Sequence, residues 1–345
     1  MRFNELGSGA LKVSEVCLGT MTFGQQNTIE EAQRQLDLAF ERGVNFIDTA
    51  EMYPVPVRAE TQGATERFVG AWLKGRSRDR VIVATKIAGP GRAIPWLRAG
   101  KLQIDRANVT AAVETSLQRL QTDYIDLYQF HWPDRYVPLF GGTSYEPAQE
   151  RASTPLVEQL EAIASVIRAG KVRHWGLSNE TAWGVTAFAR TARELGLPPP
   201  ITIQNAYNLI NRHYEYALAE AGRQEAVDLL PYSPLAFGYL TGKHLEAPAP
   251  GSRVALFQGF NARYAKTNVQ EAVAAYVELA RTHQLTPTQL ALAFVRSRWF
   301  VKSTIIGATT ESQLIEDLDA FERELSPEVL AGIERIHERY PNPTA

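Results

Sequence analysis

The sequence predicts an α/β protein, a (β/α)8 or TIM barrel with an N-terminal β-hairpin and long active-site loops. Short apolar runs alternate along the chain with amphipathic stretches of helical spacing, an order that favours a parallel sheet with helical crossovers. Eight strand candidates can be identified, and eight right-handed βα units close most simply into a barrel. A doubly wound open sheet is the competing architecture. Because no internal repeat or linker is present, residues 1–345 are expected to form one domain.

The predicted elements follow one another in order. Residues 3–13 are expected to form the hairpin, which turns at Gly7-Ser8-Gly9. Helices are expected at 28–42, 65–74, 105–120, 155–169 and 181–195, among other places, because apolar residues recur there at helical spacing. The eight strands are expected to end at Gly19, Asp48, Lys86, His131, Ser178, Gln204, Tyr232 and Ile306.

Four intervals are too long for simple connections. Three of them, at 54–62, 89–103 and 133–153, are rich in Pro, Gly, Arg and aromatic residues and follow candidate strands. The fourth, at 245–266, follows the seventh strand. Loops after barrel strands surround the active-site mouth, so the first three are expected to shape a substrate pocket.

Composition excludes several classes of protein. Hydrophobic residues make up 45% of the chain, and the formal net charge of −2 gives no reason to expect nucleic acid or an anionic membrane as partner. The single cysteine, Cys17, rules out an intrachain disulfide and a multi-cysteine metal site. The N-terminus lacks the apolar core of a signal peptide, and no run is long enough to span a bilayer. A cytoplasmic location is therefore expected.

Four side chains with acid–base chemistry lie at or just beyond the ends of predicted strands: Asp48, Tyr53, Lys86 and His131. A phenol with a pKa near ~10 is a weak acid at neutral pH, and a neighbouring ammonium lowers that pKa. Lys86 can supply the ammonium and Asp48 can hold it in place. His131 can then hydrogen-bond the substrate oxygen. The set predicts general acid–base catalysis at a carbonyl or an alcohol.

Each of the four residues also has a structural explanation. Asp48 can be a turn former, Lys86 a solvated strand end, and His131 a core histidine. Tyr53 can be part of loop packing. Their shared placement after strands two to four favours catalysis, because those strand ends meet at one barrel mouth.

Polar and aromatic groups at later strand ends predict a cofactor site. Ser178, Asn179 and Gln204 can hydrogen-bond a carboxamide such as that of nicotinamide. Tyr232 offers a ring for stacking, although it can also be a core aromatic. Phosphate can bind the stretch 307–310 before a helix, or the cations Lys243 and Arg253, each of which can also be a solvated charge.

Other site classes are disfavoured. There is no G-x-G-x-x-G stretch, which disfavours a Rossmann domain, and residues 238–243 have one residue too few for a P-loop. No H-E-x-x-H pair occurs, so no metal site is expected and a metal-dependent hydrolase is a weak interpretation. A cofactor-free barrel hydrolase is a distant third alternative, after the two roles that bind a cofactor.

The ordered motifs resemble the aldo-keto reductase superfamily along essentially the whole chain, most closely its Tas-like branch, which is related to potassium-channel β-subunit-type reductases. The matching segments are LGTMTFG (18–24), DTAEMYP (48–54), ETQG (60–63), LQTDY (120–124), HWP (131–133), GLSNET (176–181), TIQN (202–205), YSPL (232–235) and LTGK (240–243).

This resemblance implies a barrel that binds NADPH without a Rossmann fold and reduces an aldehyde or ketone by direct hydride transfer. It implies that Tyr53 donates the proton, that Lys86 and Asp48 tune it, and that His131 orients the carbonyl. It implies cofactor contacts at Gly19, Thr20, Met21, Asp48, Ser178, Asn179, Gln204, Tyr232, Ser233, Pro234, Leu235, Phe237, Lys243, Arg253, Gly307, Thr309, Gln313, Glu316 and Asp317.

Two positions depart from the family pattern. Gln313 replaces a common arginine, and Asp317 replaces an asparagine that contacts adenine. An acidic side chain there is expected to weaken binding of the 2′-phosphate. The preference for NADPH over NADH is therefore an expectation that the sequence leaves open.

The biological role, substrate and oligomeric state are also left open. The alternative role is an NADP(H)-binding regulatory or scaffold subunit with slow or vestigial reductase activity. The expected partner is a small-molecule carbonyl substrate, and the chain can be a monomer or a homo-oligomer. Apolar residues expected around the substrate, some of which can be simple packing, are Met21, Met52, Trp96, Trp132, Tyr136 and Phe140.

Overall fold

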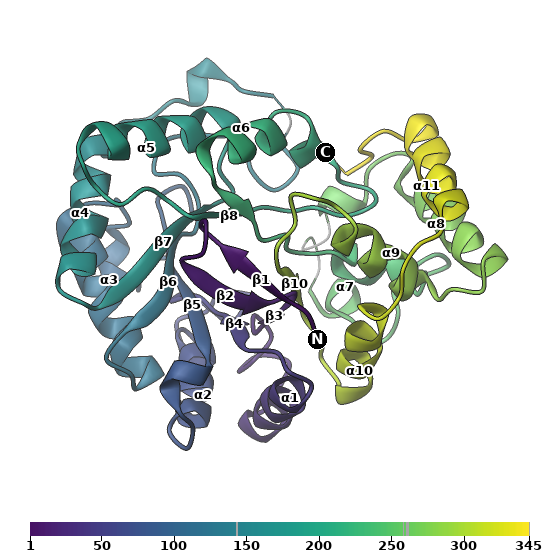
Figure 1. Ribbon diagram of the computed structural model, residues 1–345, viewed down its shortest axis with the longest axis horizontal. Helices are drawn as coiled ribbons and strands as arrows, with labels where there is room; N and C mark the ends of the chain where they lie inside the picture. Colours follow the sequence, from purple (N-terminus) through teal and green to yellow (C-terminus); the bar gives the residue numbers. More distant parts are fainter. Residues whose placement is uncertain (143, 258, 260–261, 345) are drawn as a thin grey trace.

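A computed structural model of the chain describes residues 1–142, 144–257, 259 and 262–344. Within these residues, eight parallel strands form one sheet in the order β10-β3-β4-β5-β6-β7-β8-β9 (Figure 1). The strands are β3 (Val16–Gly19), β4 (Phe46–Asp48), β5 (Ile82–Ile87), β6 (Ile125–Phe130), β7 (Val172–Ser178), β8 (Thr202–Gln204), β9 (Asp228–Leu229) and β10 (Thr304–Ile306).

Two backbone hydrogen bonds join the first and last strands of this order, each through a residue just outside one of them. Lys302 N donates to Leu229 O at 3.3 Å, and Ile305 N donates to Pro231 O at 2.9 Å. The sheet therefore curls round to meet itself, and the predicted barrel class is confirmed. The predicted strand ends agree within one residue except at Tyr232, which lies beyond β9 and forms an isolated bridge with Ala206. Pro231 lacks the N–H that would continue the ladder.

Helices cover the outside of the strands (Figure 1). Those predicted from periodicity are confirmed as α1 (Ile29–Glu41), α2 (Ala64–Leu73), α3 (Arg106–Leu120), α4 (Leu156–Arg168) and α5 (Ala182–Glu194). The others are α6 (Leu218–Glu225), α7 (Arg253–Leu256), α8 (Val269–Thr282), α9 (Pro287–Arg296), α10 (Glu311–Ala320) and α11 (Pro327–Arg339). Local sequence sets several starts: Thr28 with Glu31 and Thr286 with Gln289 form capping boxes, which satisfy free N–H groups of the first turn.

The predicted hairpin covers the N-terminal end of the barrel. Strands β1 (Phe3–Leu6) and β2 (Leu11–Ser14) pair antiparallel, and Gly7 N donates to Asp228 Oδ2 at the start of β9. Gly7 has a φ of +57°, and a Cβ there would lie 2.7 Å from Ile201 Cβ, so the turn requires glycine. Because the hairpin closes this end, the opposite end is left for a site.

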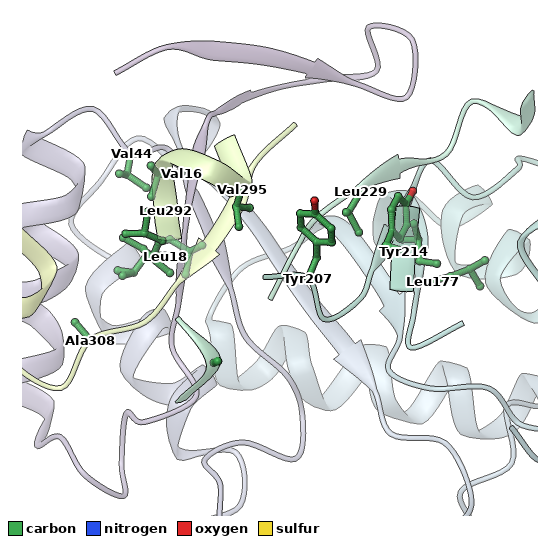
Figure 2. Close-up of a cluster of buried hydrophobic side chains, with 14 of the residues drawn as sticks. Val16, Leu18, Val44, Leu177, Tyr207, Tyr214, Leu229, Leu292, Val295 and Ala308 are labelled. Atoms are coloured by element: carbon green, nitrogen blue, oxygen red, sulfur yellow. The ribbon is translucent and has the colours of Figure 1, made fainter. Parts of the chain in front are cut away.

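The main hydrophobic core lies between the strands and the surrounding helices. Figure 2 shows Leu18 of β3, Leu177 of β7 and Leu292 of α9 in this core, although they come from distant parts of the chain. Close packing of these side chains holds the strands, and therefore the strand ends, in fixed positions. In the part of the chain that the structure describes, every helix is too short or too polar to cross a bilayer.

Candidate active site

A cavity of about 860 Å³ opens at the C-terminal ends of the strands. All residues predicted to contact a cofactor lie on its wall: Gly19, Thr20, Met21, Asp48, Ser178, Asn179, Gln204, Tyr232, Ser233, Pro234, Leu235, Phe237, Lys243, Arg253, Gly307, Thr309, Gln313, Glu316 and Asp317. Tyr53 and His131 also line it, whereas Lys86 is fully buried behind them. The barrel therefore gathers residues from positions 19 to 317 into one cavity.

An ion pair lies beneath the cavity floor. Lys86 Nζ donates to Asp48 Oδ2 at 2.5 Å and to Thr49 O at 2.8 Å. Burial acts to lower the pKa of Lys86, but Asp48 raises it, and the net direction is upward. Lys86 is therefore an ammonium at neutral pH.

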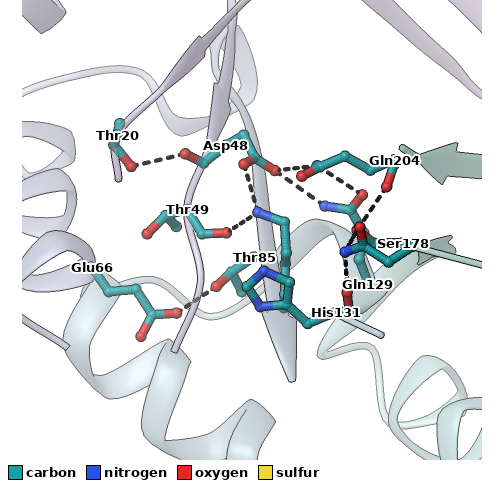
Figure 3. Close-up of polar contacts among 11 residues, drawn as sticks. Thr20, Asp48, Thr49, Glu66, Thr85, Gln129, His131, Ser178 and Gln204 are labelled. Atoms are coloured by element: carbon teal, nitrogen blue, oxygen red, sulfur yellow. Dashed lines mark hydrogen bonds and ion pairs between the residues drawn. The ribbon is translucent and has the colours of Figure 1, made fainter. Parts of the chain in front are cut away.

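The second oxygen of Asp48 is held by two amides. Gln204 Nε2 donates to Asp48 Oδ1 at 2.8 Å, and Gln129 Nε2 donates to it at 3.2 Å (Figure 3). Since Gln204 Nε2 also donates to Gln129 Oε1, both of its hydrogens point into the barrel. Gln204 therefore has its amide oxygen, and not its nitrogen, left for a ligand.

Tyr53 lies directly above this ion pair. Lys86 Nζ is 5.0 Å from the centre of the Tyr53 ring. Burial raises the pKa of Tyr53 above its ordinary value, and Lys86 opposes that rise. The expected net lowering of the Tyr53 pKa is thus not found, because loss of water around the phenol outweighs the ammonium. The phenol therefore keeps its proton at neutral pH.

His131 lies beside Tyr53, with the two rings edge to face and their centres 5.6 Å apart. Burial, Lys86 and Arg92 together bring the pKa of His131 well below its usual range. The imidazole is therefore neutral and carries one N–H. Its Nδ1 is buried without a hydrogen-bond partner among the described residues. We call the part of the cavity lined by Tyr53, His131 and Trp132 the reaction end.

The predicted carboxamide-binding residues lie next to His131. Asn179 Nδ2 donates to the main-chain oxygen of His131 at 2.9 Å, and Tyr232 OH donates to Asn179 Oδ1 at 2.7 Å. Ser178 Oγ donates to Gln204 O at 2.8 Å. Asn179 has a φ of +53°, a left-handed conformation that asparagine tolerates better than most residues. These bonds fix the polar groups in place before any ligand arrives.

The predicted phosphate-binding loop is held by Gln313. Both the backbone N–H and the hydroxyl of Thr309 donate to Gln313 Oε1 at 3.0 Å. The loop precedes α10, whose N-terminus has Thr310 as a capping residue. Gln313 therefore shapes the loop from inside, a contact that its replacement of a family arginine did not predict.

Charges at this side of the cavity are strongly influenced by burial. Burial lowers the pKa of Arg253 to about 10, and it lowers the pKa of Lys243. Burial, followed by the nearby Glu316, raises the pKa of Asp317 well above its ordinary value, while Lys243 opposes the rise. Asp317 therefore carries less negative charge than a solvated aspartate.

The predicted substrate wall is only partly assembled. Met21, Met52, Trp132 and Phe140 line the cavity. Trp96 and Tyr136 do not: Trp96 is 40% exposed, and the ring of Tyr136 packs on Tyr145. Sequence reasoning missed two cations of the cavity wall, Arg92 and Arg263. Both lie in intervals recognised as long loops, which was the only signal that could have indicated them.

A buried ion pair fixes the loop that carries Arg92. Glu51, directly before Met52, accepts a hydrogen bond of 2.6 Å from Ala88 N and forms an ion pair with Arg98. Burial raises the pKa of Glu51, and Arg98 opposes the rise.

Among the described residues, no three His, Cys, Asp or Glu side chains come together as metal ligands.

Comparison with known proteins gives matches along nearly the whole chain. A sequence model of the Aldo/keto reductase family matches residues 15–338. The chain is 48% identical over 345 residues to "Protein tas" of Escherichia coli strain K12, with 99% of each chain covered. It is 39% identical over 252 residues to an "Aldo-keto reductase" of Babesia bovis, covering 69% of this chain and 88% of that one. It is 32% identical over 352 residues to a "Probable voltage-gated potassium channel subunit beta" of Arabidopsis thaliana, covering 99% and 98%. The family match spans the barrel from β3 almost to the end of α11.

Proposed function

Since the chain belongs to the aldo/keto reductase family, and is by that membership an oxidoreductase, we propose that it reduces an aldehyde or ketone to an alcohol with NADPH. The observation that carries this proposal is the buried Lys86–Asp48 pair directly beneath Tyr53, at the floor of the cavity. A structural ion pair would not need a phenol and a neutral imidazole placed above it and open to a cavity.

The residues of the cavity fit a nicotinamide dinucleotide. Asn179, Ser178 and the oxygen of Gln204 offer partners for a carboxamide, and Tyr232 offers a ring face. The loop before α10 offers backbone N–H groups for phosphate, and Lys243 and Arg253 would hold the 2′-phosphate. When bound, the cofactor supplies the hydride that reduces the carbonyl carbon.

The protein's own residues supply the proton and the orientation. Tyr53 donates its phenolic proton to the carbonyl oxygen as negative charge develops there. Lys86 stabilises the phenolate that this transfer leaves, and Asp48 holds the ammonium in position. The neutral imidazole of His131 donates its one N–H to the same oxygen, which fixes the direction of the carbonyl.

A cytoplasmic location forms part of this proposal. Cys17 is buried and forms no disulfide, which suits a reducing compartment.

The second candidate role rests on the similarity to proteins named as potassium-channel β subunits. In that role the chain binds NADP(H) as a regulatory or scaffold subunit and turns over slowly. Turnover rate distinguishes the two, because both roles require cofactor binding.

The test is a panel of aldehydes and ketones offered to the purified protein with NADPH, with cofactor consumption followed by absorbance. Multiple turnovers per protein with at least one carbonyl, and matching alcohol formation, are expected. Tight NADPH binding without consumption across the panel would contradict the proposed reductase and favour the regulatory role.

A further inference from the structure

We infer that the carbonyl substrate carries a carboxylate, which Arg92 binds at the reaction end of the cavity; the inference rests on the proposed reductase function. Nothing in the shared chemistry of hydride and proton transfer requires a cation at this place. We therefore attribute the cation at this place to selection of the substrate.

Arg92 reaches the catalytic residues from the loop after β5. Its guanidinium carbon is 4.3 Å from the ring centre of Phe140 and 5.1 Å from that of Trp132. It lines the same cavity as Tyr53 and His131, and it is close enough to contribute to the lowered pKa of His131. A group bound to Arg92 would thus belong to a molecule whose other end meets Tyr53.

Arg92 has no anionic partner of its own among the described residues. No carboxylate of that part of the chain lies within ion-pair distance of Arg92. Burial lowers its pKa, the phenols of Tyr53 and Tyr232 oppose that fall, and the nearby Arg263 adds to it. Arg98, on the same loop, is neutralised by the buried Glu51. The loop therefore carries one arginine that fixes the structure and one whose charge faces the cavity.

The reaction end as a whole is electropositive. The only described carboxylates on the cavity wall are Asp48, Glu316 and Asp317. Asp48 is paired with Lys86, and the other two lie near Lys243.

A second cation lies near Arg92. The guanidinium carbon of Arg263 is 5.3 Å from the ring centre of Phe140, so two arginines lie close to one ring. Arg263 also interacts with Tyr232 and Tyr264, whereas Arg92 makes no hydrogen bond to a described residue. Arg92 is therefore the freer of the two to bind an anion.

A carboxylate suits this place better than a neutral polar group. Guanidinium and carboxylate form two parallel charge-assisted hydrogen bonds, and these strengthen where little water competes. Met52, Trp132 and Phe140 give the rest of the wall an apolar character. The substrate class that fits is a carbonyl compound with one carboxylate on an otherwise apolar body.

The test compares an acid with its neutral isostere. para-Carboxybenzaldehyde and methyl para-formylbenzoate are reduced with NADPH by the unmodified protein, Arg92→Met and Arg92→Lys. Succinic semialdehyde and its methyl ester form a second, flexible pair. The unmodified protein is expected to prefer the acid in kcat/KM by roughly ten- to a hundredfold, mainly through KM, as loss of a charged hydrogen bond implies. Arg92→Met should lose that preference while it reduces the esters normally, and Arg92→Lys should keep part of it.

Arg106→Met is the matched control, because Arg106 is an exposed arginine outside the cavity. Arg106→Met should leave kcat/KM for both the acid and the ester unchanged. NADPH affinity should be equal in all variants; a loss confined to Arg92→Met would mean that Arg92 serves the cofactor, which overturns the inference. Equal use of acid and ester by the unmodified protein also overturns it, while the reductase proposal stands.

A binding measurement decides the inference without turnover. para-(Hydroxymethyl)benzoate and benzyl alcohol are titrated into NADP⁺-loaded protein, with tryptophan fluorescence as the readout. The acid should bind the unmodified protein more tightly than Arg92→Met, and benzyl alcohol should bind both equally. Equal binding of the acid to both proteins would overturn the inference, whether or not the protein reduces any aldehyde. Absence of aldehyde reduction would instead contradict the proposed function.

Discussion

The buried ammonium of Lys86 donates a 2.5 Å hydrogen bond to Asp48 Oδ2 across two neighbouring strands, β5 and β4. Parallel pairing brings the ends of these strands together, so residues 38 positions apart along the chain meet below the cavity. Burial would otherwise favour the neutral amine, and the carboxylate reverses that effect. Lys86 therefore stays protonated beneath Tyr53 at every pH near neutrality.

Lys86→Met should shift the pH dependence of alcohol oxidation upward. In the proposed mechanism, Tyr53 is the base in that direction and must be ionised, so the rate should rise as pH passes through the Tyr53 pKa. Burial already raises this pKa and Lys86 opposes the rise, so removing Lys86 raises it further. The rising limb should move to higher pH, and reduction at neutral pH should slow because the phenol is a weaker acid. Lys101→Met, at an exposed position, serves as the control. An unchanged limb in an active Lys86→Met protein would refute the coupling.

Lys243→Met should weaken NADPH binding far more than NADH binding. The ammonium lines the cavity beside Arg253, and only NADPH carries the 2′-phosphate. Loss of one charged hydrogen bond costs about 1.5–3 kcal/mol, or roughly ten- to a hundredfold in affinity. Titration of both cofactors by tryptophan fluorescence measures this. Equal NADH and NADPH affinities in the unmodified protein would contradict the assignment of the two cations.

Asp317→Asn should strengthen NADPH binding by an amount that grows with pH. The pKa of Asp317 is raised well above its ordinary value, so its negative charge appears only as pH rises through that shifted value. Below it the carboxyl is neutral and resembles asparagine; above it the charge repels the 2′-phosphate. The measurement is the ratio of the NADPH dissociation constants of the unmodified protein and Asp317→Asn, taken at a series of pH values. A ratio that stays constant would show that Asp317 does not titrate beside the cofactor.

Gly70→Ala should destabilise the barrel by about 1–3 kcal/mol, the usual cost of overpacking. A Cβ on Gly70 of α2 would lie 2.3 Å from Arg119 O and 2.8 Å from Leu120 Cα, at the end of α3. Gly75→Ala is the matched control, because nothing lies within 4 Å of its Cβ position. Denaturant unfolding compares the two. Equal midpoints would show that α3 can move away from α2 without cost.

Much of the fold follows from local patterns. The predicted strand ends at Gly19, Asp48 and Ser178 agree with the structure. Buried strands are short apolar runs in the sequence, and turn-forming residues mark where they end. The barrel rule then brings these ends together, which is why every residue predicted to contact a cofactor lies on the wall of one cavity.

Other features depend on three-dimensional surroundings that no pattern encodes. Desolvation decides the direction of the Tyr53 pKa, and it depends on residues far apart in sequence. The inward amide of Gln204 depends on Gln129 of another strand. Arg92 lies in a loop without periodicity, so nothing local distinguished it from a solvated charge. The interval after β9 contains the short helix α7, which begins at Arg253. The sequence predicted only a long loop there.

The most direct test of the account is reduction of a carbonyl substrate by Tyr53→Phe. Phenylalanine keeps the ring and removes only the hydroxyl, so the proposed proton donor is lost while the packing against His131 remains. Tyr136→Phe, outside the cavity, is the matched control and should react normally. The account predicts that Tyr53→Phe binds NADPH like the unmodified protein but turns over about a hundredfold to ten-thousandfold more slowly, the usual contribution of general acid catalysis. Near-normal turnover in Tyr53→Phe would contradict it.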